Sequence, residues 1–193
     1  MKVPFRYQAT EFDCVPTVFT NALQYLFDRK QIPPVVVQKI MSYSLDEENQ
    51  LGTTGEAVLN IMQLLDDTFD FKRCEYLPQE QIHLRRGNKI MSCINRGGIA
   101  LLRVCLSKTD TLFHYLLMLG ADENDSNWLL FHDPLYRVNP FLGEDKNYIQ
   151  LLGGNDRQGA NIRIRRERLE LYEYSKYAMG ELDERECCLL ERA

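Results

Sequence analysis

The spacing of apolar residues changes near Gly97-Gly98, and this change constrains the fold more than any other feature of the sequence. Upstream, apolar residues recur every three or four positions, which is typical of one buried face of a helix. The helices expected from this spacing are 15–28, 35–44, about 53–65 and 88–96. Asp13 is the expected N-cap of the first helix, and Thr53 with Glu56 is expected to form a capping box on the third.

Strand patterns dominate downstream of the two glycines. The strands expected there are 99–106, 113–119, 127–132 and 160–166, and one further strand, 69–77, is expected upstream of the glycines. The run 99–106 is apolar apart from Arg103, as in a central strand, and 160–166 alternates with period two, as in an edge strand. The turn-rich segment 120–126 predicts that 113–119 and 127–132 form a hairpin. Helices that precede an antiparallel sheet indicate the α+β class.

The end of the chain is expected to be more loosely held. Residues 166–179 are helical in character and stop at Gly180, and the last dozen residues are rich in charge. The 193 residues suit a single domain, 1–193, with a core at about 3–140 and a strand and helical extension at 160–193.

Composition narrows the classes of function. The formal net charge is −5, with no basic excess that would indicate a nucleic-acid partner. No apolar stretch reaches the ~20 residues of a membrane helix, so no membrane association is expected. The first residues lack the apolar core of a signal peptide, and the expected location is the cytoplasm.

Six cysteines are present, but without a CxxC pair they do not suggest a structural zinc site, and no metal or cofactor is expected. Cys93 and Cys105 lie in apolar runs and are interpreted as small buried hydrophobic residues. The adjacent Cys187 and Cys188 are interpreted as an incidental pair near a mobile, exposed tail.

Cys14 differs from the other cysteines because it begins a predicted helix. Unpaired N–H groups at a helix start favour a thiolate. Gln8 lies six residues earlier, and its side-chain N–H, with the backbone N–H of Cys14, is a candidate donor to an oxyanion. A thiol, an amide, an imidazole and a carboxylate are the groups needed to form and resolve an acyl-thioester.

The predicted hairpin supplies the imidazole and the carboxylate. If Gly120 pairs with Asn127, His114 lies opposite Asp133, close enough for a hydrogen bond that would orient the imidazole. A register slip of one would place His132 opposite His114 instead. Each residue alone has an ordinary structural interpretation, and His132 is interpreted as structural.

Together these residues resemble the papain-like peptidases that cleave double-glycine leaders from bacteriocin precursors. The segments that carry the resemblance are Gln8 through the first helix, Gly52-Thr53-Thr54-Gly55, His114-Tyr115 and Asp133-Pro134. The resemblance covers about residues 3–140 and implies a free-standing papain-like fold. The roles it implies are oxyanion donor for Gln8, nucleophile for Cys14, base for His114 and orienting residue for Asp133. The sequence departs from the family in having Val15-Pro16-Thr17 after the cysteine, where the family usually has glycine and a small residue.

The expected function is that of a cysteine peptidase acting on a peptide or protein substrate. Two alternatives stay open. An acyltransferase would pass the same thioester to an amine, and a non-catalytic module of the same fold would bind peptides without cleaving them.

Overall fold

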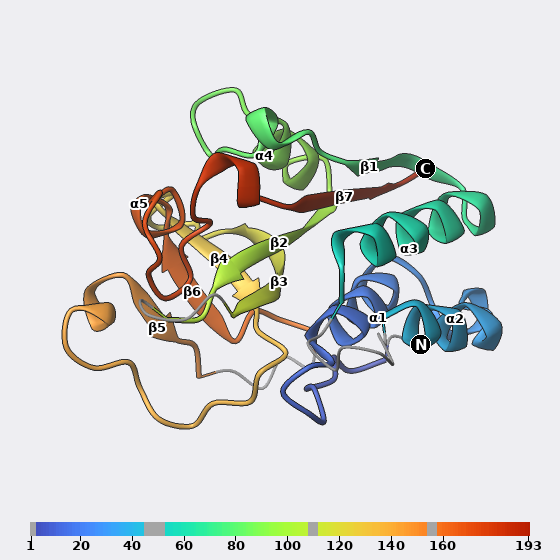
Figure 1. The fold of residues 1–193 in the computed structure, drawn as a ribbon, viewed down its shortest axis with the longest axis horizontal. Helices are drawn as coiled ribbons and strands as arrows, with labels where there is room; N and C mark the ends of the chain where they lie inside the picture. The colour runs from blue at the N-terminus through green and yellow to red at the C-terminus, as the bar shows by residue number, and fades with distance from the viewer. Residues whose placement is uncertain (1–2, 45–52, 108–111, 154–157) are drawn as a thin grey trace.

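The computed structural model describes residues 3–44, 53–107, 112–153 and 158–193. Within these residues, five α-helices pack around one seven-stranded sheet (Figure 1). The helices are α1 (Cys14–Leu26), α2 (Pro34–Ser44), α3 (Gly55–Thr68), α4 (Lys89–Ile94) and α5 (Arg166–Leu169). The strands are β1 (Phe71–Tyr76), β2 (Ile99–Cys105), β3 (Phe113–Ala121), β4 (Trp128–His132), β5 (Ile149–Leu151), β6 (Ile162–Arg165) and β7 (Cys187–Arg192).

The sheet has the strand order β1-β7-β2-β3-β4-β6-β5, and every pair of neighbours is antiparallel. Helices and an antiparallel sheet in one chain confirm the predicted α+β class. The predicted hairpin is also present, as β3 and β4.

Helices α1 and α3 cover one face of the sheet, and α2 packs against these two helices (Figure 1). The apolar stripe predicted for the first helix is its buried side, and Val18, Phe19 and Leu23 have no exposed surface. Pro16 lies in the first turn, where its missing N–H costs no helical hydrogen bond. Burial of this stripe packs α1 against the sheet, and its first residue, Cys14, interacts with His114, the second residue of β3.

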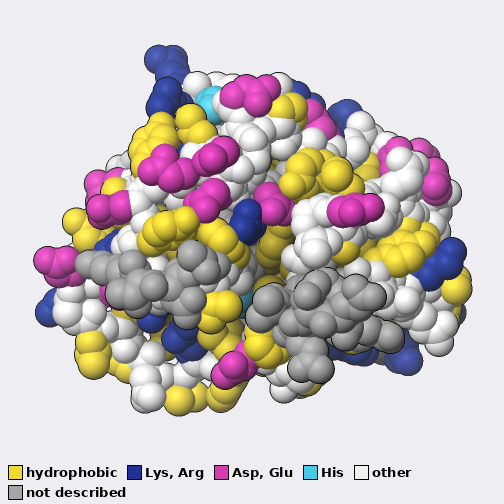
Figure 2. Space-filling model, viewed as in Figure 1, with side chains coloured by type: hydrophobic (Ala, Val, Ile, Leu, Met, Phe, Trp, Pro, Cys, Tyr) yellow, Lys and Arg dark blue, Asp and Glu magenta, His cyan; other side chains and the backbone are white. Residues whose placement is uncertain are grey.

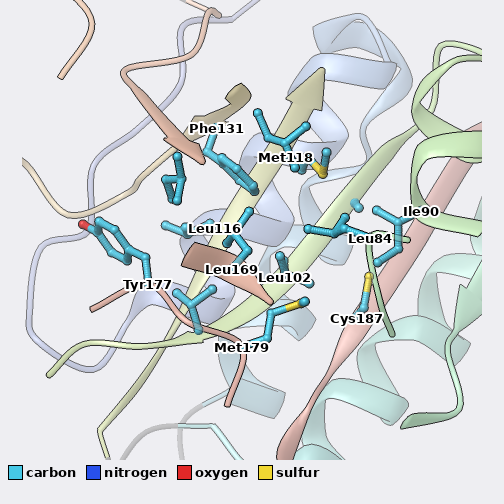
Figure 3. Packing of buried hydrophobic residues seen from close by; sticks show 14 of the residues in the cluster. Leu84, Ile90, Leu102, Leu116, Met118, Phe131, Leu169, Tyr177, Met179 and Cys187 are labelled. Carbon is cyan, nitrogen blue, oxygen red and sulfur yellow. The ribbon is translucent and has the colours of Figure 1, made fainter. Parts of the chain in front are cut away.

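A second hydrophobic core lies on the opposite face of the sheet (Figure 3). Strand β2 contributes to both cores, because Ile99 and Leu101 face the helices while Ala100, Leu102 and Val104 face away from them. A strand buried on both faces needs apolar residues at nearly every position, which explains the uninterrupted run in the sequence.

The carboxy-terminal residues are the main departure from the sequence-based expectation. The loosely held tail was a wrong prediction, because β7 lies between β1 and β2 and is buried from Cys187 to Glu191. Cys187 and Cys188 are fully buried, so the prediction that this pair is exposed is wrong as well. The buried Glu191 is neutralised by Arg96 at 2.8 Å and Lys72 at 3.1 Å, which lets a charged segment enter the sheet.

Three smaller predictions also need correction. The helix expected over 166–179 ends at Leu169, as α5, and the residues up to Gly180 form turns and bends instead. Strand β6 is not an edge strand, because the three-residue β5 pairs along its outer side. The N-cap of α3 is Thr54, whose hydroxyl accepts a hydrogen bond from Ala57, and the Thr53 hydroxyl binds the Ser44 carbonyl instead. Gly52, the first residue of the segment Gly52-Thr53-Thr54-Gly55 that carries part of the resemblance, lies outside the described residues.

On the face drawn in Figure 2, acidic side chains are scattered over the upper half, with hydrophobic side chains among them. Among the described helices, none combines the length and the apolar character needed to cross a membrane.

Candidate active site

Cys14 is the first residue of α1 and is 92% buried, with 8% of its surface exposed. Asp13 occupies the N-cap position, but its carboxylate accepts no hydrogen bond from the backbone N–H groups of the first helical turn. Instead it accepts hydrogen bonds from the Ala9 and Thr10 backbone N–H groups at 2.9 and 2.7 Å and from the Thr10 hydroxyl at 2.8 Å. Asp13 therefore shapes the loop between Gln8 and Cys14 rather than capping α1.

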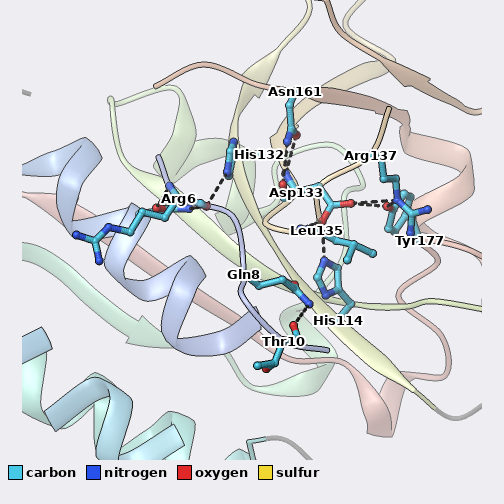
Figure 4. Close-up of polar contacts among 11 residues, drawn as sticks. Arg6, Gln8, Thr10, His114, His132, Asp133, Leu135, Arg137, Asn161 and Tyr177 are labelled. Carbon is cyan, nitrogen blue, oxygen red and sulfur yellow. Dashed lines mark hydrogen bonds and ion pairs between the residues drawn. The ribbon is translucent and has the colours of Figure 1, made fainter. Parts of the chain in front are cut away.

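His114, the second residue of β3, lies between a carboxylate and a thiol. Its Nε2 is 2.7 Å from Asp133 Oδ1 (Figure 4), and the Cys14 side chain is near enough to the same ring to raise the pKa of His114. Because Nε2 is engaged by Asp133, Nδ1 is the ring nitrogen left for the Cys14 sulfur. Three of the four predicted site residues thus form one chain of contacts.

The hairpin register differs from the predicted one. Leu117, not Tyr115, lies opposite His132, and the pairing is irregular between Met118 and Gly120. The observed register is displaced by two residues, and side chains in a strand alternate with period two, so the predicted face is preserved. The side chain of His114 therefore reaches Asp133 diagonally, from beyond the end of β4, rather than from the directly opposite position.

Asp133 is held by more groups than the sequence suggested (Figure 4). Its Oδ1 also accepts the Leu135 N–H at 2.8 Å, and its Oδ2 accepts the Tyr177 hydroxyl. The Asn161 side chain binds both backbone groups of Asp133, accepting from N–H at 2.7 Å and donating to the carbonyl at 2.8 Å. Sequence reasoning missed Tyr177 and Asn161, because neither lies in a motif or near Asp133 in the chain.

The contacts set the protonation states of the pair. Burial acts to lower the pKa of His114, but hydrogen bonds with Asp133 and Cys14, and the negative charge of both, raise it to about 9. Burial acts to raise the pKa of Asp133, but the hydrogen bonds from His114, Tyr177 and Leu135 hold it below its ordinary value. At neutral pH the site therefore favours an imidazolium bound to a carboxylate, with the sulfur on its other side.

Gln8 is anchored beside this group, and its side chain is held by a residue of its own loop. Its backbone N–H donates to the Pro134 carbonyl at 2.9 Å, which ties it to the residue after Asp133. Its Nε2 donates to the Thr10 carbonyl at 2.7 Å, and its Oε1 is buried without a hydrogen-bond partner. An amide nitrogen carries two hydrogens, so one remains for an oxyanion.

His132 has a different environment. Its ring packs against Phe5 and Tyr7, with centroids 4.8 and 5.5 Å apart, and its Nε2 is 3.4 Å from the Arg6 carbonyl. Burial lowers the pKa of His132. This histidine holds the amino-terminal arm against β4, in agreement with its structural interpretation.

The other cysteines are unsuited to nucleophilic chemistry. All six cysteines are unpaired. Cys93 and Cys105 are buried, as predicted, and burial raises the pKa of both thiols, that of Cys93 to about 11. Cys74 is partly exposed, but burial and the charge of Asp66 raise its pKa to about 12. Within the described residues, no group of three or more potential ligands could hold a metal ion.

Two cavities differ in how their lining residues relate to Cys14, His114 and Asp133. A cavity of about 280 Å³ lies beside the site and includes Tyr7, Arg137 and Asn161 in its lining. A larger cavity of about 370 Å³ is lined by Tyr148, Arg168 and neighbouring residues, none of which contacts Cys14, His114 or Asp133. The interactions of His114 with Cys14 and Asp133 identify the candidate site, because the volume of a cavity does not indicate which reaction its lining could support.

Comparison of the chain with protein-family models, with curated proteins and with solved structures finds no match.

Proposed function

We propose that this protein is a papain-like cysteine peptidase that cleaves an amide bond through an acyl-thioester on Cys14. The observation that carries the proposal is the buried His114 ring, which contacts the Cys14 thiol on one side and the Asp133 carboxylate on the other. A structural histidine needs one such partner. A nucleophile, a base and a group that orients the base form the arrangement used for acyl transfer.

The papain-like fold is part of the proposal and has support from the order of the elements. The cysteine begins a helix packed on an antiparallel sheet, the histidine lies near the start of a strand, and the carboxylate follows the next strand. This is the order that the resemblance implies. Cytoplasmic location is proposed as well, because all six thiols are unpaired.

In the proposed mechanism the proton of Cys14 rests on His114. The thiolate attacks the substrate carbonyl carbon, a C–S bond forms, and the carbonyl π electrons move to oxygen. The Cys14 N–H and the second amide hydrogen of Gln8 stabilise this oxyanion. His114 then protonates the leaving nitrogen as the C–N bond breaks.

Water then hydrolyses the thioester, and in this step His114 acts as the base. His114 accepts a proton from water as the oxygen attacks the carbonyl carbon, and the C–S bond breaks to return the thiolate. The acid product leaves as a carboxylate, and His114 is again an imidazolium. Asp133 keeps the ring oriented through both steps.

Selective alkylation tests the nucleophile without knowledge of the substrate. At about pH 6, an ordinary thiol of pKa ~8.5 is less than one per cent ionised. A small excess of iodoacetamide should therefore modify Cys14 first, because the neighbouring imidazolium favours its thiolate. Peptide mapping by mass spectrometry identifies the labelled residue.

Cys74 is the matched internal control, because it is the one cysteine classed as partly exposed. Accessibility alone would favour Cys74 over the buried Cys14. The variant His114→Ala should slow labelling of Cys14 and leave Cys74 unchanged. If Cys74 were modified before Cys14, no activated nucleophile would be present and a peptide-binding module would replace the peptidase.

Hydrolysis and acyl transfer are separated by the product. A peptide mixture is incubated with the protein and with Cys14→Ala, in the presence of millimolar glycinamide as an added amine. New carboxyl termini in the wild-type sample alone support a hydrolase. New amide adducts of glycinamide would indicate an acyltransferase instead.

A further inference from the structure

We propose that Tyr177 is a positioning residue for the proposed reaction, which holds the Asp133 carboxylate in the orientation that fixes the His114 ring. This inference rests on the proposed function and deepens it. It also assigns a role at the site to the carboxy-terminal part of the chain, which lies outside the residues that carry the resemblance.

The two oxygens of Asp133 have separate partners. Oδ1 binds His114 and the Leu135 N–H, while Oδ2 accepts the Tyr177 hydroxyl (Figure 4). Rotation of the carboxylate would break contacts on both oxygens. Removing the Tyr177 hydroxyl leaves Oδ2 with one cation nearby, Arg137, whose Nε is 3.8 Å away.

Arg137 supports the tyrosine rather than replacing it. Its Nε donates to the Tyr177 oxygen at 3.1 Å, so the hydroxyl accepts one hydrogen bond and donates the other to Asp133. The contacts run in sequence from Arg137 through Tyr177, Asp133 and His114 to Cys14. Among the described residues, these are the charged and titratable groups whose contacts join them to Asp133.

The backbone at Tyr177 is in a conformation that most residues avoid. Its φ of 62° is the one positive value for a non-glycine residue among the described residues. A non-glycine residue in this region is strained, and such residues persist where their surroundings hold them, often at functional sites. The Tyr177 N–H donates to the Cys105 carbonyl at 2.7 Å, and the Cys105 N–H donates to the Ala178 carbonyl at 2.8 Å.

The side chain is well suited to a permanent donor. Tyr177 has no exposed surface, and its ring packs edge-on against Phe141 with centroids 5.9 Å apart. Burial and the negative charge of Asp133 raise the pKa of Tyr177 well above its ordinary value. The phenol therefore keeps its proton around neutral pH, where Asp133 is ionised, and can donate its hydrogen bond to Oδ2 there.

The test is Tyr177→Phe, which keeps the ring and removes the hydroxyl. Because a hydrogen bond to a charged group is lost, we expect peptide hydrolysis to slow roughly 10- to 100-fold. The Asp133 carboxylate would then accept one hydrogen bond fewer and would stabilise the positive charge of the imidazolium more strongly. His114 should therefore titrate at a higher pH. The titration is read from the ring signals of His114 by NMR, which needs no substrate.

Fluorinated tyrosine at position 177 gives a second measurement that leaves the fold and the hydroxyl in place. A more acidic phenol is a stronger donor to Asp133, so the His114 titration should move to lower pH, opposite to Tyr177→Phe. Tyr174→Phe is the matched control, because that hydroxyl donates to Glu184 at 2.6 Å, in the same segment. It should leave the His114 titration unchanged.

The outcomes separate this inference from the proposed function. Selective labelling of Cys14 with an unmoved His114 titration in both Tyr177 variants would overturn the positioning role and leave the peptidase intact. A purely structural role would lower thermal stability without moving the titration in opposite directions. Absence of selective Cys14 labelling in the wild type would count against the function itself.

Discussion

His114 and His132 show how the surroundings of an imidazole decide what it can do. Both are buried and lie on neighbouring strands, yet the pKa of His114 is raised and that of His132 is lowered. The difference is that His114 contacts a carboxylate and a thiol, while His132 contacts two aromatic rings and a carbonyl. Only the first environment supports a proton that moves during a reaction.

We therefore expect His114→Ala to abolish turnover, since no other described group contacts both Cys14 and Asp133. His132→Ala is the matched control. It should lower the free energy of unfolding by loosening the amino-terminal arm, and turnover per folded molecule should change much less. Steady-state kinetics and urea unfolding measure the two effects. Equal loss of turnover in both variants, with unchanged stability, would mean that the base is the wrong histidine.

Gln8→Ala tests the proposal that the Gln8 side chain donates a hydrogen bond to the oxyanion. Loss of one such donor usually lowers kcat by roughly 10²–10³-fold. Substrate binding should change less, because the carbonyl oxygen gains its charge only in the transition state. Gln63→Ala is the control, since that amide lies on the solvent-exposed side of α3 and donates to Asp67 at 3.0 Å. A normal kcat for Gln8→Ala would show that its amide serves the loop through Thr10 and not the reaction.

At the scale of elements, the loop 8–13 before α1 positions Gln8, just as the helix positions Cys14. The Asp13 carboxylate binds Ala9 and Thr10, so it holds the loop that places Gln8 beside the Asp133-Pro134 turn. Burial acts to raise the pKa of Asp13, but these hydrogen bonds outweigh it and hold the pKa below its ordinary value. The ionised form is the one that stabilises the loop.

Asp13→Ala should lower kcat by releasing Gln8, while Cys14 is still alkylated at low pH because its contact with His114 is retained. A lowered pKa means that the stability from this carboxylate is present above its unfolded pKa of about 3.9 and is lost as the pH falls further. The difference in unfolding free energy between wild type and variant should therefore shrink in acid. Glu11→Ala, which removes an exposed carboxylate of the same loop, should change neither kcat nor this pH dependence.

At the scale of the whole molecule, β7 joins the two halves of the sheet. It pairs with β1 on one side and β2 on the other, so among the described strands β7 is the hydrogen-bonded partner that connects β1 to the sheet. Its side chains enter both cores, with Leu189 on one face and Leu190 on the other. The carboxy terminus is therefore a central strand of this domain.

Leu190→Ala tests this role. Truncation of a fully buried leucine costs about 2–5 kcal/mol of unfolding free energy, because it leaves a cavity. Leu182→Ala is the matched control, since Leu182 is 42% exposed just before β7, and a surface change costs about 0.5 kcal/mol or less. Urea unfolding followed by circular dichroism compares the two. Equal midpoints would contradict a central place for β7.

The sequence by itself determined most of the local structure and which side chains are proposed to be the reactive groups. Helices α1 to α4 and strands β1 to β4 lie near their predicted positions, because apolar spacing records which face of an element is buried. Cys14, His114 and Asp133 were found from their residue types and order, and the structure brings them into contact.

The tertiary structure decided what depends on partners distant in the chain. The charge of Glu191 suggested a solvated tail, but Arg96 and Lys72 neutralise it inside the sheet. Likewise, no motif in the sequence around Tyr177 indicates its proposed positioning role, which depends on its hydrogen bond to Asp133, 44 residues away. Periodicity is a property of one segment, whereas strand register, charge pairing and the surroundings of a carboxylate are set by contacts between segments. These contacts form only when the whole chain folds.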